Sequence, residues 1–164
     1  MDKTLPVARG VRRAATWPAG TQAGVVRLDH DRRHRRRLRL VTESGWPFLL
    51  DLAETTLLAH DDALVLDDGR LIRVVAEPEA LLDIHTHDTP SLLRIAWHLG
   101  NRHLPVEVAG KHLRVRADHV IEAMVQGLGG HVEVISAVFS PEAGAYAGEG
   151  HGHDHAEHDR HSHD

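Results

Sequence analysis

Cysteine is absent from the sequence, and so is any long apolar run. Without cysteine there are no disulfide bonds, thiolate nucleophiles or cysteine-based zinc fingers, so any binding of a transition metal must use imidazole and carboxylate groups. No segment approaches the roughly 20 apolar residues of a membrane-spanning helix. The basic N-terminal segment lacks the apolar core and cleavage site of a secretory signal, which predicts a cytoplasmic protein with no membrane partner.

Histidine is abundant instead, with 16 copies among 164 residues. The formal charge of −5 hides an asymmetry, because arginines cluster near the front while acids and histidines crowd the end. The length permits one mid-sized domain or two small ones. The composition therefore indicates a globular protein with a polar segment appended to it.

The segment from Val25 to Val75 consists of short apolar or alternating runs between turn residues, without a helical period. Asp67-Asp68-Gly69 separates two of these runs, and Asp-Gly is a strong signal for a hairpin turn. Residues 1–76 are therefore expected to form a small all-β domain, with a linker at Glu77-Pro78-Glu79.

Residues 77–141 mix strand-like and helix-like patterns. Thr89 is the expected N-cap of a first helix, with Pro90 at its first position, and Asp118 is the expected cap of a second. The predicted elements are a strand, a helix, two hairpin strands, a helix and a strand, at residues 80–84, 90–99, 105–108, 113–116, 119–128 and 131–139. This β-α-β-β-α-β order predicts an α+β protein with a ferredoxin-like second domain.

Residues 142–164 contain almost nothing that could build a core, so we expect a disordered tail. Its imidazoles, with an ordinary pKa of about 6.5, are mostly uncharged near neutral pH and offer lone pairs to a divalent ion. A mobile tract binds without a preformed cage and exchanges its ion readily. An expression tag is the alternative, although tags are usually uninterrupted histidine blocks. The tail histidines are His151, His153, His155, His158, His161 and His163.

A second group of interest lies where the first helix is expected to end, at Gly100-Asn101, with His103 directly after it. His98 and His103 would point in different directions at about 100° per residue, so they make a poor chelating pair. In a two-fold dimer, an isologous contact would bring two copies of His103 together. A histidine that simply caps the helix end is the plainer alternative.

The segment from His98 to Pro105 reads His-Leu-Gly-Asn-Arg-His-Leu-Pro and resembles the signature of the UreE family of urease accessory proteins. Asp118-His119-Val120, the segment from Pro141 to Tyr146 and the histidine-rich end fit the same family, and the likeness runs from about Val25. The resemblance implies a peptide-binding-like first domain and a ferredoxin-like metal-binding domain. It also implies a homodimer that carries Ni(II) to apo-urease through other accessory proteins, including the GTPase.

The resemblance assigns roles to two histidines by position. His103 corresponds to the metal ligand at the dimer interface, and His119 to a secondary ligand. Some relatives have another histidine two positions before His119, where this chain has Ala117, which puts the secondary site in doubt. His112 on the hairpin is a substitute ligand or a plain solvent-facing strand residue. Because nitrogen and oxygen ligands follow the Irving–Williams order, Zn(II), Cu(II) or Co(II) are also expected to bind.

Two rival functions remain open from the sequence. A passive nickel or zinc buffer needs the same tail but no partner. A nucleic-acid-binding regulator would use the basic run from Arg32 to Arg39, but this run lacks interleaved aromatic residues and is better explained as a strand with an exposed basic face. His85 and His87 would chelate from one strand face, but we expect them in a loop. Since there is no catalytic triad, phosphate loop or HExxH helix, we expect no enzyme and no nucleic-acid partner.

Overall fold

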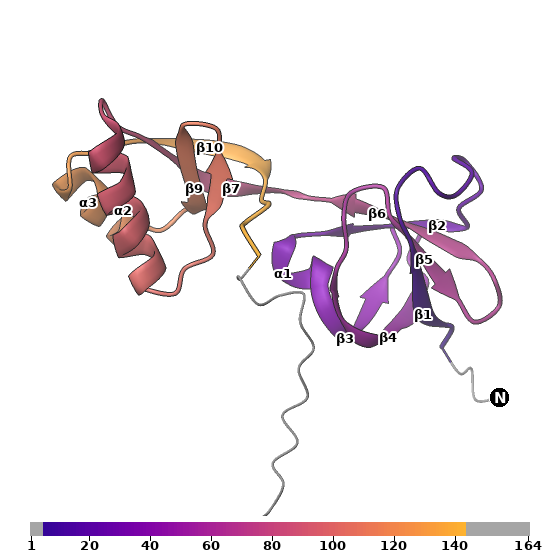
Figure 1. Ribbon diagram of the computed structural model, residues 1–164. Coiled ribbons are helices and arrows are strands. Elements are labelled where there is room, and N and C mark those ends of the chain that lie inside the picture. The colour runs from indigo at the N-terminus through magenta and orange to yellow at the C-terminus, as the bar shows by residue number, and fades with distance from the viewer. Residues whose placement is uncertain (1–4, 144–164) are drawn as a thin grey trace, which may run out of the picture.

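The computed structural model describes residues 5–143, so the six tail histidines lie outside the described residues. Two β-sheets follow one another along the chain (Figure 1), a six-stranded sheet and then a four-stranded sheet with two helices. This arrangement confirms the expected α+β class. None of the helices between residues 5 and 143 is long and apolar enough to cross a membrane.

The six-stranded sheet has the order β2-β6-β5-β1-β4-β3. Its strands alternate between buried and half-exposed side chains, as in Pro47–Leu57, because successive side chains of a strand point to opposite faces. The buried side chains, among them Leu28, Leu50 and Ile72, form one core. The elements of this part are β1 Val7–Arg12, β2 Gly24–Leu28, α1 His30–Arg33, β3 His34–Val41, β4 Pro47–Leu57, β5 Ala63–Leu66 and β6 Leu71–Ala76.

The hairpin predicted at Asp67-Asp68-Gly69 joins β5 to β6, and Gly69 has the positive φ of 83° that such a turn requires. Strand β1 and helix α1 were not expected. Strand β1 lies between β4 and β5, and its pairing partners stand more than 40 residues away. The basic run is divided between two roles, since Arg33 is buried in α1 whereas the arginines of β3 are exposed.

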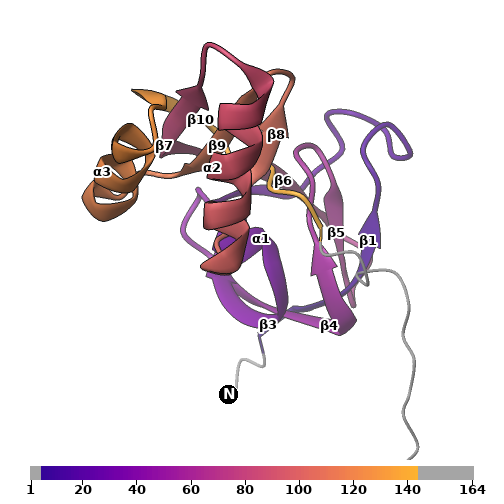
Figure 2. The same ribbon diagram turned by 60° about the vertical axis from the view of Figure 1, so that its left-hand side comes forward.

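The four-stranded sheet has the order β10-β7-β9-β8, and every neighbouring pair is antiparallel. Helices α2 and α3 pack on one face of it (Figures 1 and 2), where Ile95, Leu99, Ile121 and Val125 meet apolar side chains of the strands. This is the predicted ferredoxin-like order. The elements are β7 Pro78–His85, α2 Thr89–Asn101, β8 Glu107–Ala109, β9 His112–Arg116, α3 His119–Gly127 and β10 His131–Val138.

Two local expectations were wrong. The N-cap of α2 is Asp88, whose carboxylate accepts the backbone N–H of Ser91 at 2.8 Å, while Thr89 is already the first helical residue. The expected linker is shorter than predicted, because Pro78 and Glu79 begin β7 and pair with Val138 and Ala137 of β10. The cap of α3 is Asp118, as predicted.

Side chains from both parts meet where β7 begins. The guanidinium of Arg33 donates to the carbonyl oxygen of Phe139 at 2.8 Å, and both residues are buried. Arg116 of β9 pairs with Asp31 of α1 at 3.0 Å and with Glu79 at 3.2 Å. These contacts hold the short helix α1 against the end of the four-stranded sheet where β7 begins and β9 ends.

Candidate metal-binding site

His103 stands in the turn that ends α2. Its backbone N–H donates to Gly100 O at 2.9 Å, and the N–H of Leu104 donates to Leu99 O at 3.3 Å. These two bonds form a Schellman motif in which His103 occupies the position where glycine is usual, with a φ of 57°. The exposed imidazole is therefore presented from a fixed turn whose backbone conformation is unfavourable for a histidine.

A groove of about 540 Å³ lies beside His103 and is lined from both parts of the chain. His30 and His34 line the same groove, with ring centroids 6.1 Å apart. Burial, followed by the positive charges of Arg33 and Arg116, lowers the pKa of His30. Neither His30 nor His34 was a predicted site residue, because only the contact between the two parts brings them near His103.

His119 begins α3 and is exposed. The preceding Asp118 accepts the backbone N–H groups of Val120 and Ile121, and the bond from Ile121 is the main reason why the pKa of Asp118 lies below its usual value. Residues just after His103 and just before His119 line one small pocket, so both histidines stand at the same end of the four-stranded sheet.

His112 begins β9 at the opposite end of this sheet, because β9 runs from His112 towards α3. A strand of five residues is about 16 Å long. The ring nitrogen Nδ1 of His112 lies 2.5 Å from Asp83 Oδ2, and the side chain of His112 is 43% exposed. His112 therefore lies too far from His119 to be the substitute ligand that the sequence suggested for the secondary site.

Between residues 5 and 143, no three His, Asp or Glu side chains are arranged to hold a single ion. A transition metal needs at least four ligands in most protein sites. Within the described part of one chain, His103 could thus supply a single ligand, and a metal site there would need further ligands from another copy, from water or from residues outside the described range.

An apolar surface lies on α2, the helix that ends just before His103. Leu93 and Trp97, one turn apart on α2, are each 64% exposed, and Val120 of α3 is 57% exposed. Leu93 and Val120 are apolar residues of α2 and α3 that face away from the core. Exposed aromatic and aliphatic groups of this size are typical of protein contact surfaces.

Comparison with known proteins gives the family. Residues 5–77 match the family model for the N-terminal domain of the UreE urease accessory protein, and residues 79–164 match the model for its C-terminal domain. The chain belongs to the UreE family. The match begins at residue 5, so the likeness extends further towards the N-terminus than the start at about Val25 that the sequence suggested.

Several relatives carry the name urease accessory protein UreE. The one from Bradyrhizobium sp. strain BTAi1 is 57% identical over 137 residues, which cover 84% of this chain and 66% of the relative. The one from Rhodopseudomonas palustris strain HaA2 is 58% identical over 125 residues, covering 76% and 58%. The one from Beijerinckia indica subsp. indica is 50% identical over 147 residues, covering 87% and 85%. The UreE-family chain thus spans less than two thirds of the length of the first two.

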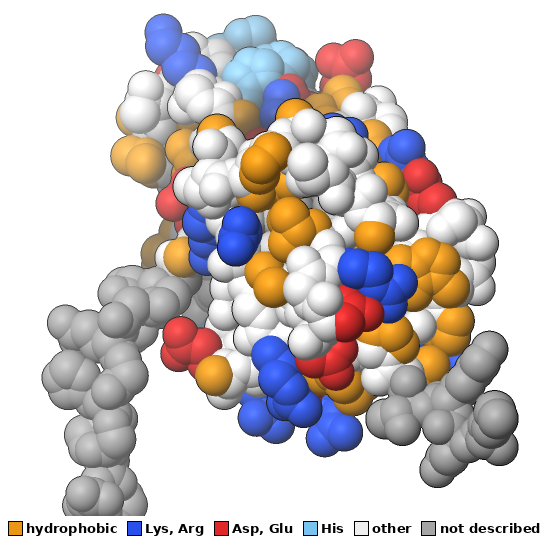
Figure 3. All heavy atoms as spheres, turned by 90° about the vertical axis from the view of Figure 1, so that its right-hand side faces the viewer, with side chains coloured by type: hydrophobic (Ala, Val, Ile, Leu, Met, Phe, Trp, Pro, Cys, Tyr) orange, Lys and Arg blue, Asp and Glu red, His pale blue; other side chains and the backbone are white. Residues whose placement is uncertain are grey.

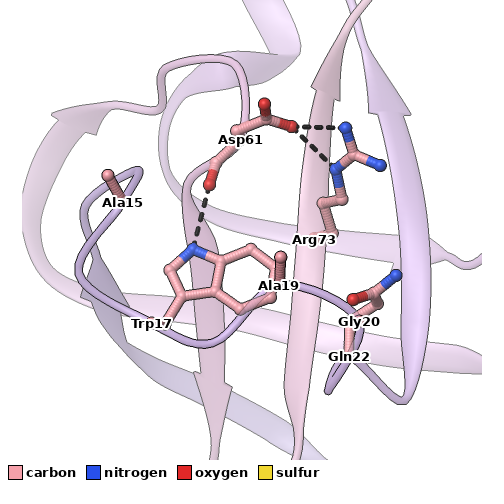
Figure 4. Close-up of a pocket in the computed structure, with 7 residues that line it drawn as sticks. All are labelled: Ala15, Trp17, Ala19, Gly20, Gln22, Asp61 and Arg73. Carbon is pink, nitrogen blue, oxygen red and sulfur yellow. Dashed lines mark hydrogen bonds and ion pairs between the residues drawn. The ribbon is translucent and has the colours of Figure 1, made fainter.

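The N-terminal part of this UreE-family chain has a pocket of its own (Figure 4), lined by residues of the β1–β2 loop together with Asp61 and Arg73. The indole N–H of Trp17 donates to Asp61 O at 3.0 Å, and the guanidinium of Arg73 donates to the Asp61 carboxylate at 2.7 Å. Because these groups already satisfy one another and include no histidine, the pocket is not a candidate metal site. The predicted peptide-binding character of this part stays a prediction.

Proposed function

We propose that this protein binds Ni(II) as cargo in the cytoplasm and passes it to apo-urease together with other accessory proteins, including the GTPase. The observation that carries the proposal is His103, an exposed imidazole held in a strained turn at the end of α2. Strained backbone persists where the surrounding structure enforces it, and it concentrates at functional sites. Membership of a family of urease accessory proteins supports apo-urease as the proposed destination of the metal.

The proposal includes a homodimer, because one imidazole per chain cannot hold nickel alone. In a two-fold dimer the same surface of each copy meets its equivalent, so a contact through the end of α2 would pair two His103 rings. Leu93 and Trp97 supply exposed apolar area on that helix, and Trp is enriched among residues that dominate interface energies. The second copy is therefore the occupant that we propose for this surface.

Delivery in this proposal is an exchange of ligands. Neutral imidazoles from the tail, His151 to His163, would complete the shell around nickel and then leave it one at a time. Zn(II), Cu(II) and Co(II) would bind the same nitrogen ligands, so the selection of nickel would come from the partners that receive it. His119, at the same end of the sheet as His103, would be a secondary ligand.

The test compares His103→Ala with His60→Ala, an exposed histidine of the N-terminal part. Nickel binding is measured by equilibrium dialysis, and urease activity is measured in cells that carry each variant. We expect His103→Ala to lose the tightest nickel site and to slow urease maturation, with His60→Ala behaving like the unchanged chain. Unchanged nickel affinity and unchanged urease maturation in His103→Ala would contradict the proposal.

The passive buffer is the alternative that shares the most chemistry. Affinity capture from a cell with urease genes separates the two, since a carrier should retain the accessory GTPase and apo-urease whereas a buffer should retain neither. The basic strand β3 is assessed separately through salt-dependent binding to DNA or RNA, which a nucleic-acid-binding protein would show and a nickel carrier would not.

A further inference from the structure

Four histidines form a row on the four-stranded sheet, at the end opposite to His103. The rings of His112 and His85 stack with centroids 5.2 Å apart, those of His85 and His131 stack at 5.2 Å, and His87 meets His131 edge-on at 4.6 Å. We call these four side chains the histidine row. Histidine side chains gather in one patch in the upper part of the surface shown in Figure 3.

Strand register explains why residues so far apart in sequence become neighbours. His131 of β10 is directly paired with His85 of β7. On the other side of β7, Leu113 pairs with Ile84, so the antiparallel register puts His112 next to His85. Because Leu113 and Ile84 face the core beneath the helices, the alternating His112 and His85 lie on the open face of the sheet.

A buried carboxylate orients one end of the histidine row. Asp83, whose side chain is only 9% exposed, binds Nδ1 of His112 at 2.5 Å and the guanidinium of Arg114 at 2.7 Å. Burial raises the pKa of Asp83, but the hydrogen bonds from Arg114 and His112 outweigh that effect and keep the pKa below its usual value. A charged carboxylate on Nδ1 fixes the tautomer that leaves Nε2 as a lone pair, the arrangement found behind metal-binding histidines.

The other end of the histidine row brings two imidazole nitrogens together. Nε2 of His131 lies 2.9 Å from Nε2 of His87, and both side chains are exposed. Two nitrogens that bind one ion at about 2.1 Å are separated by about 3.0 Å at the right angle of octahedral coordination and by about 3.4 Å at the tetrahedral angle that zinc prefers. The two rings are within hydrogen-bond distance, and a small outward shift of these exposed side chains would bring their nitrogens to the spacing of two ligands of one ion.

We propose that His87 and His131 form a second binding site for a divalent transition metal, with water in the remaining positions and His85 beside it. Two protein ligands make such a site weak and readily exchanged, which agrees with the finding that no three ligands converge within residues 5–143. The site belongs to a single chain and lies at the opposite end of the sheet from His103. It depends neither on a dimer nor on the delivery function proposed above.

The experiment uses the full chain with His103 and the six tail histidines replaced by alanine, so that of the ligands in the proposed function only the secondary ligand His119 remains. Zn(II) is titrated into this protein by calorimetry, and the ring nitrogen signals of the histidines are followed by NMR. We expect one Zn(II) per chain, with the signals of His87 and His131 shifting first. Circular dichroism confirms that each variant remains folded.

Substitutions in this background locate the ion. We expect His131→Ala and His87→Gln each to weaken Zn(II) binding at least about tenfold. His119→Ala and His60→Ala should leave it unchanged, which separates this site from the secondary ligand that the resemblance implies. No Zn(II) binding in the background protein, or binding that survives His131→Ala and His87→Gln, would overturn the proposal without touching the role of His103.

Discussion

Helices α2 and α3 end in the same turn but with different residues. In α3 the position with positive φ is Gly129, whereas in α2 it is His103. In each turn two backbone N–H groups return to carbonyl oxygens of the last helical turn. Since glycine adopts this conformation without strain, the α3 turn follows the backbone preference and the α2 turn opposes it. A histidine in the α2 turn therefore costs stability that a glycine would not, and the proposed binding role of His103 gives a reason for its presence.

The two ends of the four-stranded sheet differ in how their histidines are placed. At one end, His103 stands in a fixed turn and His119 begins α3, and within residues 5–143 no three possible ligands converge there, so the metal site proposed for His103 takes a second copy. The other end offers His87 and His131 as a pair within one chain. Variants of this UreE-family protein can separate these two cases.

The largest effect is expected for Trp97→Glu, which adds a charge to the proposed dimer surface. Truncation of a central interface Trp typically costs about 2–4 kcal/mol, so the dimer should dissociate at micromolar concentration. Nickel binding at His103 should be lost with it, while Zn(II) binding at the histidine row persists. Sedimentation velocity with Arg39→Glu as an exposed control on β3 checks the prediction, and an intact Trp97→Glu dimer would refute the proposed interface.

The next largest effect concerns the glycine pair that ends α3. A Cβ at Gly130 would stand 2.6 Å from Val125 Cγ1 and 2.8 Å from Ile95 Cδ1, so Gly130→Ala should lower the free energy of unfolding. Overpacking of this kind costs about 1–3 kcal/mol. Gly127→Ala is the matched control, because a Cβ there meets nothing within 4 Å. Urea denaturation of both variants measures the difference, and equal stabilities would contradict the packing described here.

Smaller changes in the free energy of unfolding, of opposite sign, are expected for substitutions in the turns that end α2 and α3. His103→Gly should raise the free energy of unfolding by about 1 kcal/mol, because it removes the cost of a positive φ in a residue with a Cβ. Gly129→Ala should lower it by a similar amount, about 1 kcal/mol. His103→Gly should also lose the nickel site. If both substitutions destabilise the protein, the α2 turn is not strained.

Much of the fold could be predicted from local patterns. Short or alternating apolar runs predicted strands where β2, β5 and β6 lie, and apolar residues at helical spacing predicted α2 and α3. Helix α1 could not be predicted, because its four residues depend on the cap Asp29 and on Glu79, which accepts the backbone N–H of His30 at 3.0 Å. Asp88 and Thr89 are both capable N-caps, and only the extended backbone of Asp88 decides between them.

The sites could be predicted less fully. Sequence spacing drew attention to His85 and His87, but His131 stands more than 40 residues later and joins them only through the pairing of β7 with β10. His112 was considered as a companion of His119, and only the direction of β9 separates them. The approach of His131 to His87 depends on strand register and leaves no local signal in the sequence, whereas the segment around His103 could be found through its resemblance to a family signature.

The smallest effect on stability is expected when the pH is lowered and the carboxylate of Asp83 becomes protonated. Its pKa in the folded protein lies below the unfolded value of about 3.9, so this carboxylate stabilises the fold above that pH. The contribution is lost as the pH falls through the lower folded value. Asp83→Asn should therefore be less stable at pH 7 and should lose less stability on acidification. Thermal unfolding between pH 7 and pH 3, with Glu54→Gln on β4 as control, measures the two slopes, and parallel slopes would argue against an ionised Asp83.

The proposed dependence of a His103 nickel site on two copies is tested most directly by native mass spectrometry of the nickel-loaded protein, with and without His103→Ala. The account predicts a dimer in which the substitution removes one nickel ion for every two chains. Removal of one ion per chain, or nickel retained by His103 in a monomer, would contradict it.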